Sequence, residues 1–261
     1  MGDRLSAPAA SWRWAEARAI GSSHVAAGQP CQDAVCVRSV DGPNGSVLLA
    51  AVSDGAGSAR YGREGARAVV RGVLLEAERH FRLSGEPPEE AAVRGWLEVV
   101  RGELADLAER RAATPRDFAA TLVAAFATSD ATLFAHVGDG AAVIDAADGS
   151  WEVGSWPAGG EYAGTTYFVT DKAGPRLTVS RVARPVTALA LFSDGIEHLI
   201  LEARARRAYS PWFDRMFDVM RGGGEPGRDR ALCRQLRTYL RSQAVDSRTH
   251  DDKSLILAVR A

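Results

Sequence analysis

The apolar run Ser46–Val52 (SVLLAAV) constrains the fold more than any other feature of this chain. A strand without polar alternation is buried on both faces, so it needs other layers of structure on either side. Alternating or β-rich segments predict strands before and after it, at residues 12–20, 34–40, 118–128, 132–137, 141–145, 151–155, 166–170, 177–182, 187–192 and 254–259. The short turns between residues 118 and 155 are typical of a β-meander.

Two amphipathic helices are expected between the early and the later strands. One apolar face repeats at three- and four-residue spacing, formed by Ala66, Val69, Val70, Val73, Leu74, Ala77 and Phe81. A second helix opens at Glu86-Pro87-Pro88, since proline suits a first turn. The final third is mostly helical, including 230–243. No linker divides the chain, so residues 1–261 predict a single α+β domain, a four-layer α/β/β/α sandwich of two antiparallel sheets with flanking helices.

Charge and cysteine content narrow the function. The chain has 32 basic and 33 acidic residues and a net charge of -1, without the basic excess typical of nucleic-acid binding. No segment approaches the roughly 20 apolar residues of a membrane span. The three cysteines have no disulfide or zinc spacing and are expected to be free thiols. The first residues lack an apolar signal core, so we expect a cytoplasmic protein with no membrane or nucleic-acid partner.

Aspartates stand where the predicted strands begin or end: Asp33, Asp54, Asp139, Asp194, Asp251 and Asp252. Each alone fits ordinary turn chemistry. Gathered at one rim, such carboxylates would repel one another, and Mg²⁺ or Mn²⁺ would relieve the repulsion because these cations prefer oxygen ligands. Two cations that share a carboxylate activate water for attack on phosphorus. The set therefore indicates metal-dependent hydrolysis.

The order of these motifs resembles that of the type 2C metal-dependent serine/threonine protein phosphatases, most closely the compact bacterial branch. The motifs are Cys31-Gln32-Asp33, Ser53-Asp54-Gly55-Ala56-Gly57, Ala120-Thr121-Leu122, Val137-Gly138-Asp139, Phe192-Ser193-Asp194-Gly195 and Asp251-Asp252, and the resemblance spans residues 20–259. It implies a monomeric enzyme that hydrolyses phosphoserine and phosphothreonine in proteins, opposite a serine/threonine kinase. It also implies two Mn²⁺ or Mg²⁺ ions and a possible weaker third site.

The resemblance also suggests metal ligands. Asp54 resembles the carboxylate that bridges two metals, and the Gly55 carbonyl would complete the second site. Asp194 and Asp251 resemble the remaining ligands of the first metal. Asp252 stands where the family usually has Asn, so Asp251 and Asp252 stay alternatives for that ligand.

Two further aspartates match the family pattern. Asp33 resembles the catalytic aspartate that binds a metal-coordinated water, and Asp139 matches the carboxylate that holds the third metal with Asp194. Thr121 is expected to pack or to hydrogen-bond in the core rather than perform chemistry.

The chain departs from the family at two positions. A family arginine that grips the substrate phosphate is replaced by a segment containing His24, and a family histidine of the second motif is Ala56. His24 is therefore a candidate to contact the phosphate or to protonate the leaving oxygen, with a plain loop hydrogen bond as the alternative. Arg60 and Arg63 are other candidates for the phosphate contact, or form a solvated first helical turn. Residues 160–168 match a variable flap that could select substrates, with a plain hairpin as the simpler alternative.

These departures leave a second interpretation of function. The chain could be a weakly catalytic or non-catalytic member that binds phosphoproteins and regulates them. The retained carboxylates favour the enzyme, because loss of a metal ligand would be expected in a non-catalytic relative. No nucleophile elbow, phosphate-binding lysine loop or His-Glu-x-x-His motif supports an unrelated hydrolase.

Overall fold

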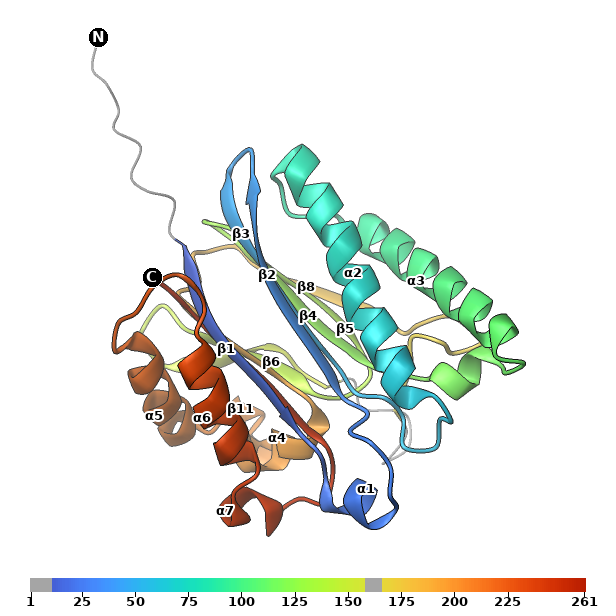
Figure 1. The fold of residues 1–261 in the computed structure, drawn as a ribbon. Coiled ribbons are helices and arrows are strands. Elements are labelled where there is room, and N and C mark those ends of the chain that lie inside the picture. The colour runs from blue at the N-terminus through green and yellow to red at the C-terminus, as the bar shows by residue number, and fades with distance from the viewer. Residues whose placement is uncertain (1–10, 158–165) are drawn as a thin grey trace.

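The computed structural model describes residues 11–157 and 166–261, which form two packed β-sheets between two layers of helices (Figure 1). This is the four-layer α+β sandwich expected from the sequence. The sheets are antiparallel apart from one short parallel pairing at an edge. Among the described helices, none combines the length and the apolar character needed to cross a membrane.

The five-stranded sheet carries the first helical layer on its outer face (Figure 1). Its strands, in spatial order, are β2 (Ala34–Gly42), β3 (Gly45–Ser53), β4 (Leu122–Ala127), β5 (Thr132–Val137) and β8 (Thr178–Val182). The covering helices are α2 (Gly62–Ser84) and α3 (Glu90–Arg110). Every member of the predicted apolar face of α2 is buried, so the helix is held by side chains packed against the sheet.

The six-stranded sheet carries the second helical layer. Its strands, in spatial order, are β12 (Gly227–Arg228), β1 (Trp12–Ala19), β13 (Lys253–Arg260), β9 (Ala188–Phe192), β6 (Ala141–Asp145) and β7 (Trp151–Ser155), with β12 parallel to β1. The covering helices are α5 (Ser210–Arg221) and α6 (Arg230–Leu240), and the segment that connects them contains β12. Both terminal segments of the described chain thus meet in one sheet.

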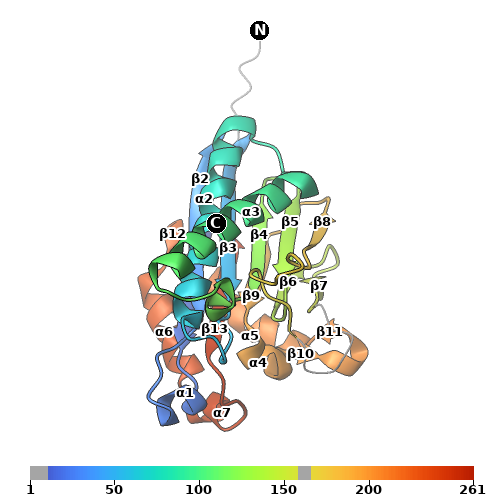
Figure 2. The ribbon, with the colours of Figure 1, turned by 90° about the vertical axis from the view of Figure 1, so that its right-hand side faces the viewer.

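Short elements gather at one end of the sandwich (Figure 2). They are α1 (Ser22–Ala26), α4 (Asp194–Ile200), α7 (Gln243–Asp246), and the paired strands β10 (Leu201–Glu202) and β11 (Arg207–Ala208). Two 3-10 turns complete the described structure, at Pro115–Phe118 and Ala203–Ala205.

The apolar run Ser46–Val52, within β3, is buried on both faces. Leu49 and Ala51 of β3 pack towards α2, and Leu48 and Val52 pack into the layer between the sheets. All four side chains are at most 1% exposed. A strand with apolar residues at every position is stable here because both of its faces are covered.

Three strand predictions were wrong. The strand expected from residue 118 begins at Leu122, because Pro115 and a Thr114–Asp117 capping box make a 3-10 turn of the preceding residues. Residues 166–170 form no strand, since the Phe168 amide donates to the Asp171 side chain and closes a turn. The predicted β-meander is also broken, because β4 and β5 lie in one sheet and β6 and β7 in the other.

The crossing between the sheets depends on two glycines. Gly138 and Gly140 follow β5 with φ of 97° and 84°, a backbone region that favours glycine. A Cβ on Gly138 would lie 2.6 Å from the Tyr167 carbonyl oxygen. The sharp turn that these glycines allow carries the residue between them, Asp139, to the seam between the two sheets.

Candidate active site

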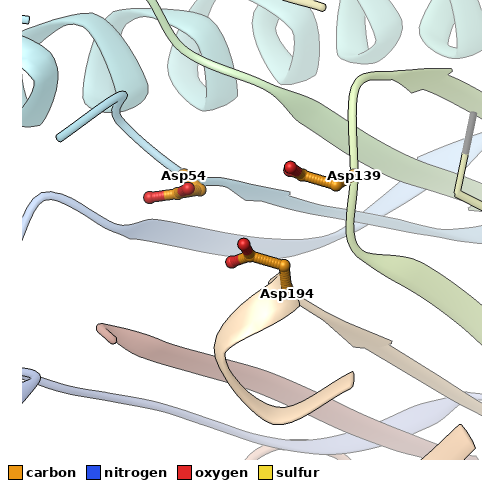
Figure 3. A group of neighbouring side chains, drawn as sticks. All are labelled: Asp54, Asp139 and Asp194. Carbon is orange, nitrogen blue, oxygen red and sulfur yellow. The ribbon is translucent and has the colours of Figure 1, made fainter. Parts of the chain in front are cut away.

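Three aspartates converge at the end of the sandwich where the short elements gather (Figure 3). Asp54 directly follows β3, Asp139 lies in the turn between β5 and β6, and Asp194 is the first residue of α4 after β9. Each offers a carboxylate oxygen, and these oxygens lie within 4.8 Å of one another. Because β3 and β9 belong to different sheets, the cluster forms only when the two sheets pack together.

Backbone contacts hold Asp54 and Asp194 in place. The Asp54 amide donates to Thr121 Oγ1 at 3.0 Å, and its carbonyl accepts from the Thr121 amide at 2.8 Å. The threonine thus hydrogen-bonds rather than reacts, as expected. Gly195 lies so close to β13 that a Cβ there would sit 1.8 Å from the Asp252 carbonyl oxygen. Only glycine lets the first turn of α4 bring Asp194 to this position.

The carboxylates of the cluster raise one another's pKa. The pKa of Asp54 lies well above its usual value because the group is desolvated and stands near Asp33 and Asp194. Burial, and then the charges of Asp139 and Asp251, raise the pKa of Asp194 to about 8. Burial also raises the pKa of Asp139, although its Oδ2 accepts a hydrogen bond from Thr166 at 2.6 Å.

This donor set fits a divalent cation. Oδ1 of Asp139 and Oδ1 of Asp194 are shielded from solvent and have no hydrogen-bond partner in the described part of the chain. Buried carboxylate oxygens without partners are costly, and close carboxylates that share no proton repel one another. Mg²⁺ and Mn²⁺ satisfy such oxygens and offset their charge.

Asp33 lies beside the cluster and is 1% exposed. Its Oδ2 accepts a hydrogen bond from Ser193 Oγ at 2.8 Å, and Ser193 Oγ in turn accepts from the Ser254 amide at 3.0 Å. Its Oδ1 has no partner among the described residues. Burial is the main cause that raises the pKa of Asp33 to about 6. Ser193 was missed in the sequence, although it directly precedes Asp194.

The neighbouring aspartates 251 and 252 differ sharply. Asp252 is buried, and its two oxygens accept the amides of Gly21 at 2.6 Å and Gln32 at 2.5 Å. Asp251 is exposed and lies outside the group of three, but its charge contributes to the raised pKa of Asp194. Asp252 therefore organises the backbone. Oδ1 of Asp251 accepts the Asp252 amide at 2.8 Å, and Asp251 as a metal ligand stays a prediction.

His24 lies against the loop that follows Asp54. Helix α1 presents it, and Ser23 anchors this helix through its amide and hydroxyl to the His250 carbonyl. Nδ1 of His24 is 2.9 Å from Asp252 Oδ2, although the two are not aligned for a hydrogen bond. Nε2 faces Gly57, where a Cβ would lie 4.0 Å away. The imidazole thus adjoins the loop in which Ala56 replaces the expected histidine.

Gln32 supports the same loop from the other side. With its amide nitrogen turned towards them, it donates to the carbonyls of Gly55 and Ala56 at 2.9 Å each. The Gly55 carbonyl, expected to bind metal, thereby uses one lone pair and keeps a second.

Glu197 and His136 were not predicted to belong to the site, but both contact or influence it. Glu197 lies one helical turn after Asp194, and burial followed by the charge of Asp139 raises its pKa to about 7; the i, i+3 spacing was a usable signal. His136, buried on β5, hydrogen-bonds to Ser155 Oγ of the other sheet at 2.8 Å and to the Asp139 carbonyl at 3.2 Å. Burial lowers the pKa of His136 to about 4.

The remaining candidates are only partly placed. The guanidinium of Arg60 lies 5.0 Å from the ring centroid of Tyr61, and Arg63 is half-buried on the first turn of α2. Residues 160–165 of the expected flap (160–168) lie outside the described residues. Thr166, at its described end, reaches Asp139.

Comparisons with known proteins agree with this geometry. Residues 20–241 match the family model described as protein phosphatase 2C. Serine/threonine-protein phosphatase 3 of Escherichia coli (strain K12) is 33% identical over 254 residues, which cover 96% of this chain and 99% of that protein.

Solved structures share the fold at lower identity. Serine/threonine phosphatase Stp1 from Staphylococcus aureus has a TM-score of 0.62 at 17% identity, with 100% of both chains covered. PppA, a key regulatory component of T6SS in Pseudomonas aeruginosa, has a TM-score of 0.60 at 19% identity, covering 97% of this chain and 99% of that one.

Proposed function

This chain belongs to the protein phosphatase 2C family and is a metal-dependent serine/threonine phosphatase, and we propose that the cluster of Asp54, Asp139 and Asp194 is its hydrolytic centre. One observation carries the proposal. Three carboxylates from separate elements converge within 4.8 Å, and two of their buried oxygens have no partner among the described residues. Such a site is costly without a cation and well suited to one.

The chain offers ligands for two cations and a weaker third. Asp54, the Gly55 carbonyl, Asp194 and Asp251 would hold two Mn²⁺ or Mg²⁺ ions, and Asp139 would hold a third ion together with Asp194. When bound, the ions supply positive charge to the carboxylates and the phosphate and lower the pKa of coordinated water. The unpartnered Oδ1 of Asp33 would accept a hydrogen bond from the attacking water and orient it.

His24 would complete the reaction on the leaving-group side. Water attacks phosphorus, the bond from phosphorus to the serine or threonine oxygen breaks, and that oxygen must gain a proton. Nδ1 lies 2.9 Å from Asp252 Oδ2, and Nε2 faces Gly57, so Nε2 would be the nitrogen that donates this proton. The products are inorganic phosphate and a free hydroxyl side chain.

The substrates are phosphoproteins, and a serine/threonine kinase reaction must supply them, because it makes the phosphate ester that this reaction hydrolyses. Mn²⁺ and Mg²⁺ both accept these oxygen donors, so we expect turnover with either ion.

The first test is hydrolysis of a phosphothreonine peptide with Mn²⁺, with Mg²⁺ and with EDTA. We expect turnover only with metal, and a loss of about 10³-fold or more in Asp54→Asn and in Asp194→Asn, because each removes a ligand charge worth several kcal/mol to the transition state. Asp106→Asn, which changes an exposed carboxylate of α3, is the matched control. Wild-type turnover in both cluster variants would refute this assignment of the centre.

A further inference from the structure

One face of α2 carries arginines without carboxylate partners. Arg63, Arg67 and Arg71 recur every four residues, so they line the same side of the helix. None of them lies within 4.0 Å of an acidic oxygen in residues 11–157 and 166–261, whereas Arg79 and Arg82, further along α2, pair with Glu76 and Glu78. The unpaired arginines lie in the half of α2 that begins at Gly62, shortly after Asp54 in the chain.

Two cavities lie along this face. The first, of about 310 Å³, is lined by Arg63 together with Gln32 and Gly57 of the active-site loops. The second, of about 360 Å³, is lined by Arg67 and Arg71 of α2 and by Arg18 of β1, over a floor that includes Ala34 and Val70. The two cavities therefore flank the short segment that carries Asp33.

The positive charges are close enough to affect one another. Partial desolvation, followed by the charges of Arg63 and Arg18, lowers the pKa of Arg67. Arg18 is also fixed in place, because its Nη1 donates to the Asp33 carbonyl at 2.7 Å. Guanidinium groups that converge on a cavity repel one another, and a carboxylate or phosphate can bind them bidentately and offset that repulsion.

We propose that this arginine face (Arg18, Arg63, Arg67 and Arg71) binds acidic side chains that flank the phosphorylated residue of a protein substrate. The proposal rests on the hydrolytic centre proposed above, beside which the first cavity opens. Arg63 and Arg71 are eight positions apart on α2, a rise of about 12 Å. An extended peptide covers this length with about four residues, so the expected recognition element is an acidic stretch of that size.

The test compares three phosphothreonine peptides, with four glutamates before the phosphorylated residue, four after it, or glutamines in their place. We expect kcat/KM to be about tenfold higher for one of the acidic peptides, and this preference to shrink at high salt because exposed charges are screened. Arg67→Glu combined with Arg71→Glu should abolish the preference. The charge-neutral pair Arg67→Gln and Arg71→Gln should reduce it less. Hydrolysis of p-nitrophenyl phosphate should stay within about twofold, since it has no flanking peptide.

The matched control is Arg234→Glu with Arg237→Glu. These arginines are exposed on α6, in the opposite helical layer, and line neither cavity. Their substitution changes the charge of the protein by the same amount as Arg67→Glu with Arg71→Glu. Equal effects of the two charge reversals would overturn the proposal, as would a wild-type enzyme without preference for acidic peptides. Stronger competition by an RNA oligonucleotide than by the unphosphorylated acidic peptide would assign the face to nucleic acid instead.

Peptide affinity separates this inference from the catalytic one. The Kd of the acidic phosphopeptide, measured on Asp54→Asn, reports binding at the arginine face without hydrolysis. Tight, salt-sensitive binding to Asp54→Asn that is lost when Arg67→Glu and Arg71→Glu are added would support the proposed role of the arginine face. This result would hold even if the hydrolytic centre were misassigned. Absence of any charge-dependent binding would refute it even if p-nitrophenyl phosphate is hydrolysed.

Discussion

Among single residues, His24 has a role that two substrates can distinguish. If Nε2 protonates the leaving oxygen, His24→Ala should lower kcat on a phosphothreonine peptide by about 10²-fold. The loss on p-nitrophenyl phosphate should be much smaller, because nitrophenolate leaves readily without a proton. The measurement is kcat and KM for both substrates at saturating metal, with His80→Ala, in α2, as the control histidine.

The other possible roles of His24 give different patterns. A contact to the substrate phosphate would raise KM for both substrates alike, since both carry that group. Unchanged kinetics for both would reduce His24 to a structural partner of Asp252.

At the scale of elements, the junction of α4 with β13 places Asp194, and Gly195 makes that junction possible. Gly195→Ala would force a Cβ against the Asp252 carbonyl, 1.8 Å away, so the first turn of α4 must move. A displacement near 1 Å at a catalytic group can cost about 10²-fold in rate. We expect such a loss in kcat/KM, with the far-ultraviolet circular dichroism spectrum retained.

Gly102→Ala is the control for this substitution. A Cβ at Gly102, within α3, meets nothing within 4 Å. Alanine there should leave activity unchanged and raise the free energy of unfolding by about 0.5–1 kcal/mol, because glycine is costly inside a helix. Full activity of Gly195→Ala would show that α4 tolerates the shift and does not constrain Asp194.

At the scale of the whole molecule, the cluster should make stability depend on pH and metal. The folded pKa of Asp194 is raised to about 8, whereas the unfolded value is about 3.9. Asp194 therefore contributes its full stabilisation at pH values below its pKa in the unfolded chain. This contribution is lost as pH rises through the pKa of Asp194 in the folded protein. In EDTA, we expect Tm to fall by roughly 3 °C between pH 6.5 and 8.0, and added Mn²⁺ to raise Tm most at pH 8.0.

The pH range begins at 6.5 in order to limit the effect of a second titrating group, His136. The folded pKa of His136 is lowered to about 4, so below about pH 6.5 protonation of the unfolded chain lowers stability with the opposite sign. Calorimetric scans of wild type, Asp194→Asn and the control Asp106→Asn would measure the effect. Glu197, whose pKa is raised to about 7, adds a smaller fall of the same sign, so Asp194→Asn should reduce the fall without abolishing it. A flat or rising Tm in EDTA between pH 6.5 and 8.0, or a fall in Asp194→Asn as large as in wild type, would contradict this account.

Much of this molecule could be predicted because the signals are local. The strands at 132–137, 141–145 and 151–155 were bounded correctly from the sequence, and the apolar face of α2 followed from its spacing. Periodicity and turn residues act over a few positions, so they need no knowledge of the fold. The order of the aspartate motifs was likewise readable, and it was enough to indicate the family.

Only the tertiary structure decided which residues lie side by side. The turn at Gly138–Gly140 looked like another hairpin, yet it transfers the chain to the second sheet and brings Asp139 to the cluster. Asp251 and Asp252 are adjacent and identical in type, and only the backbone amides of Gly21 and Gln32 distinguish them. The approach of His24 to Asp252 joins opposite ends of the chain. Such contacts result from the packing of two sheets, which depends on burial summed over both and not on any short stretch of sequence.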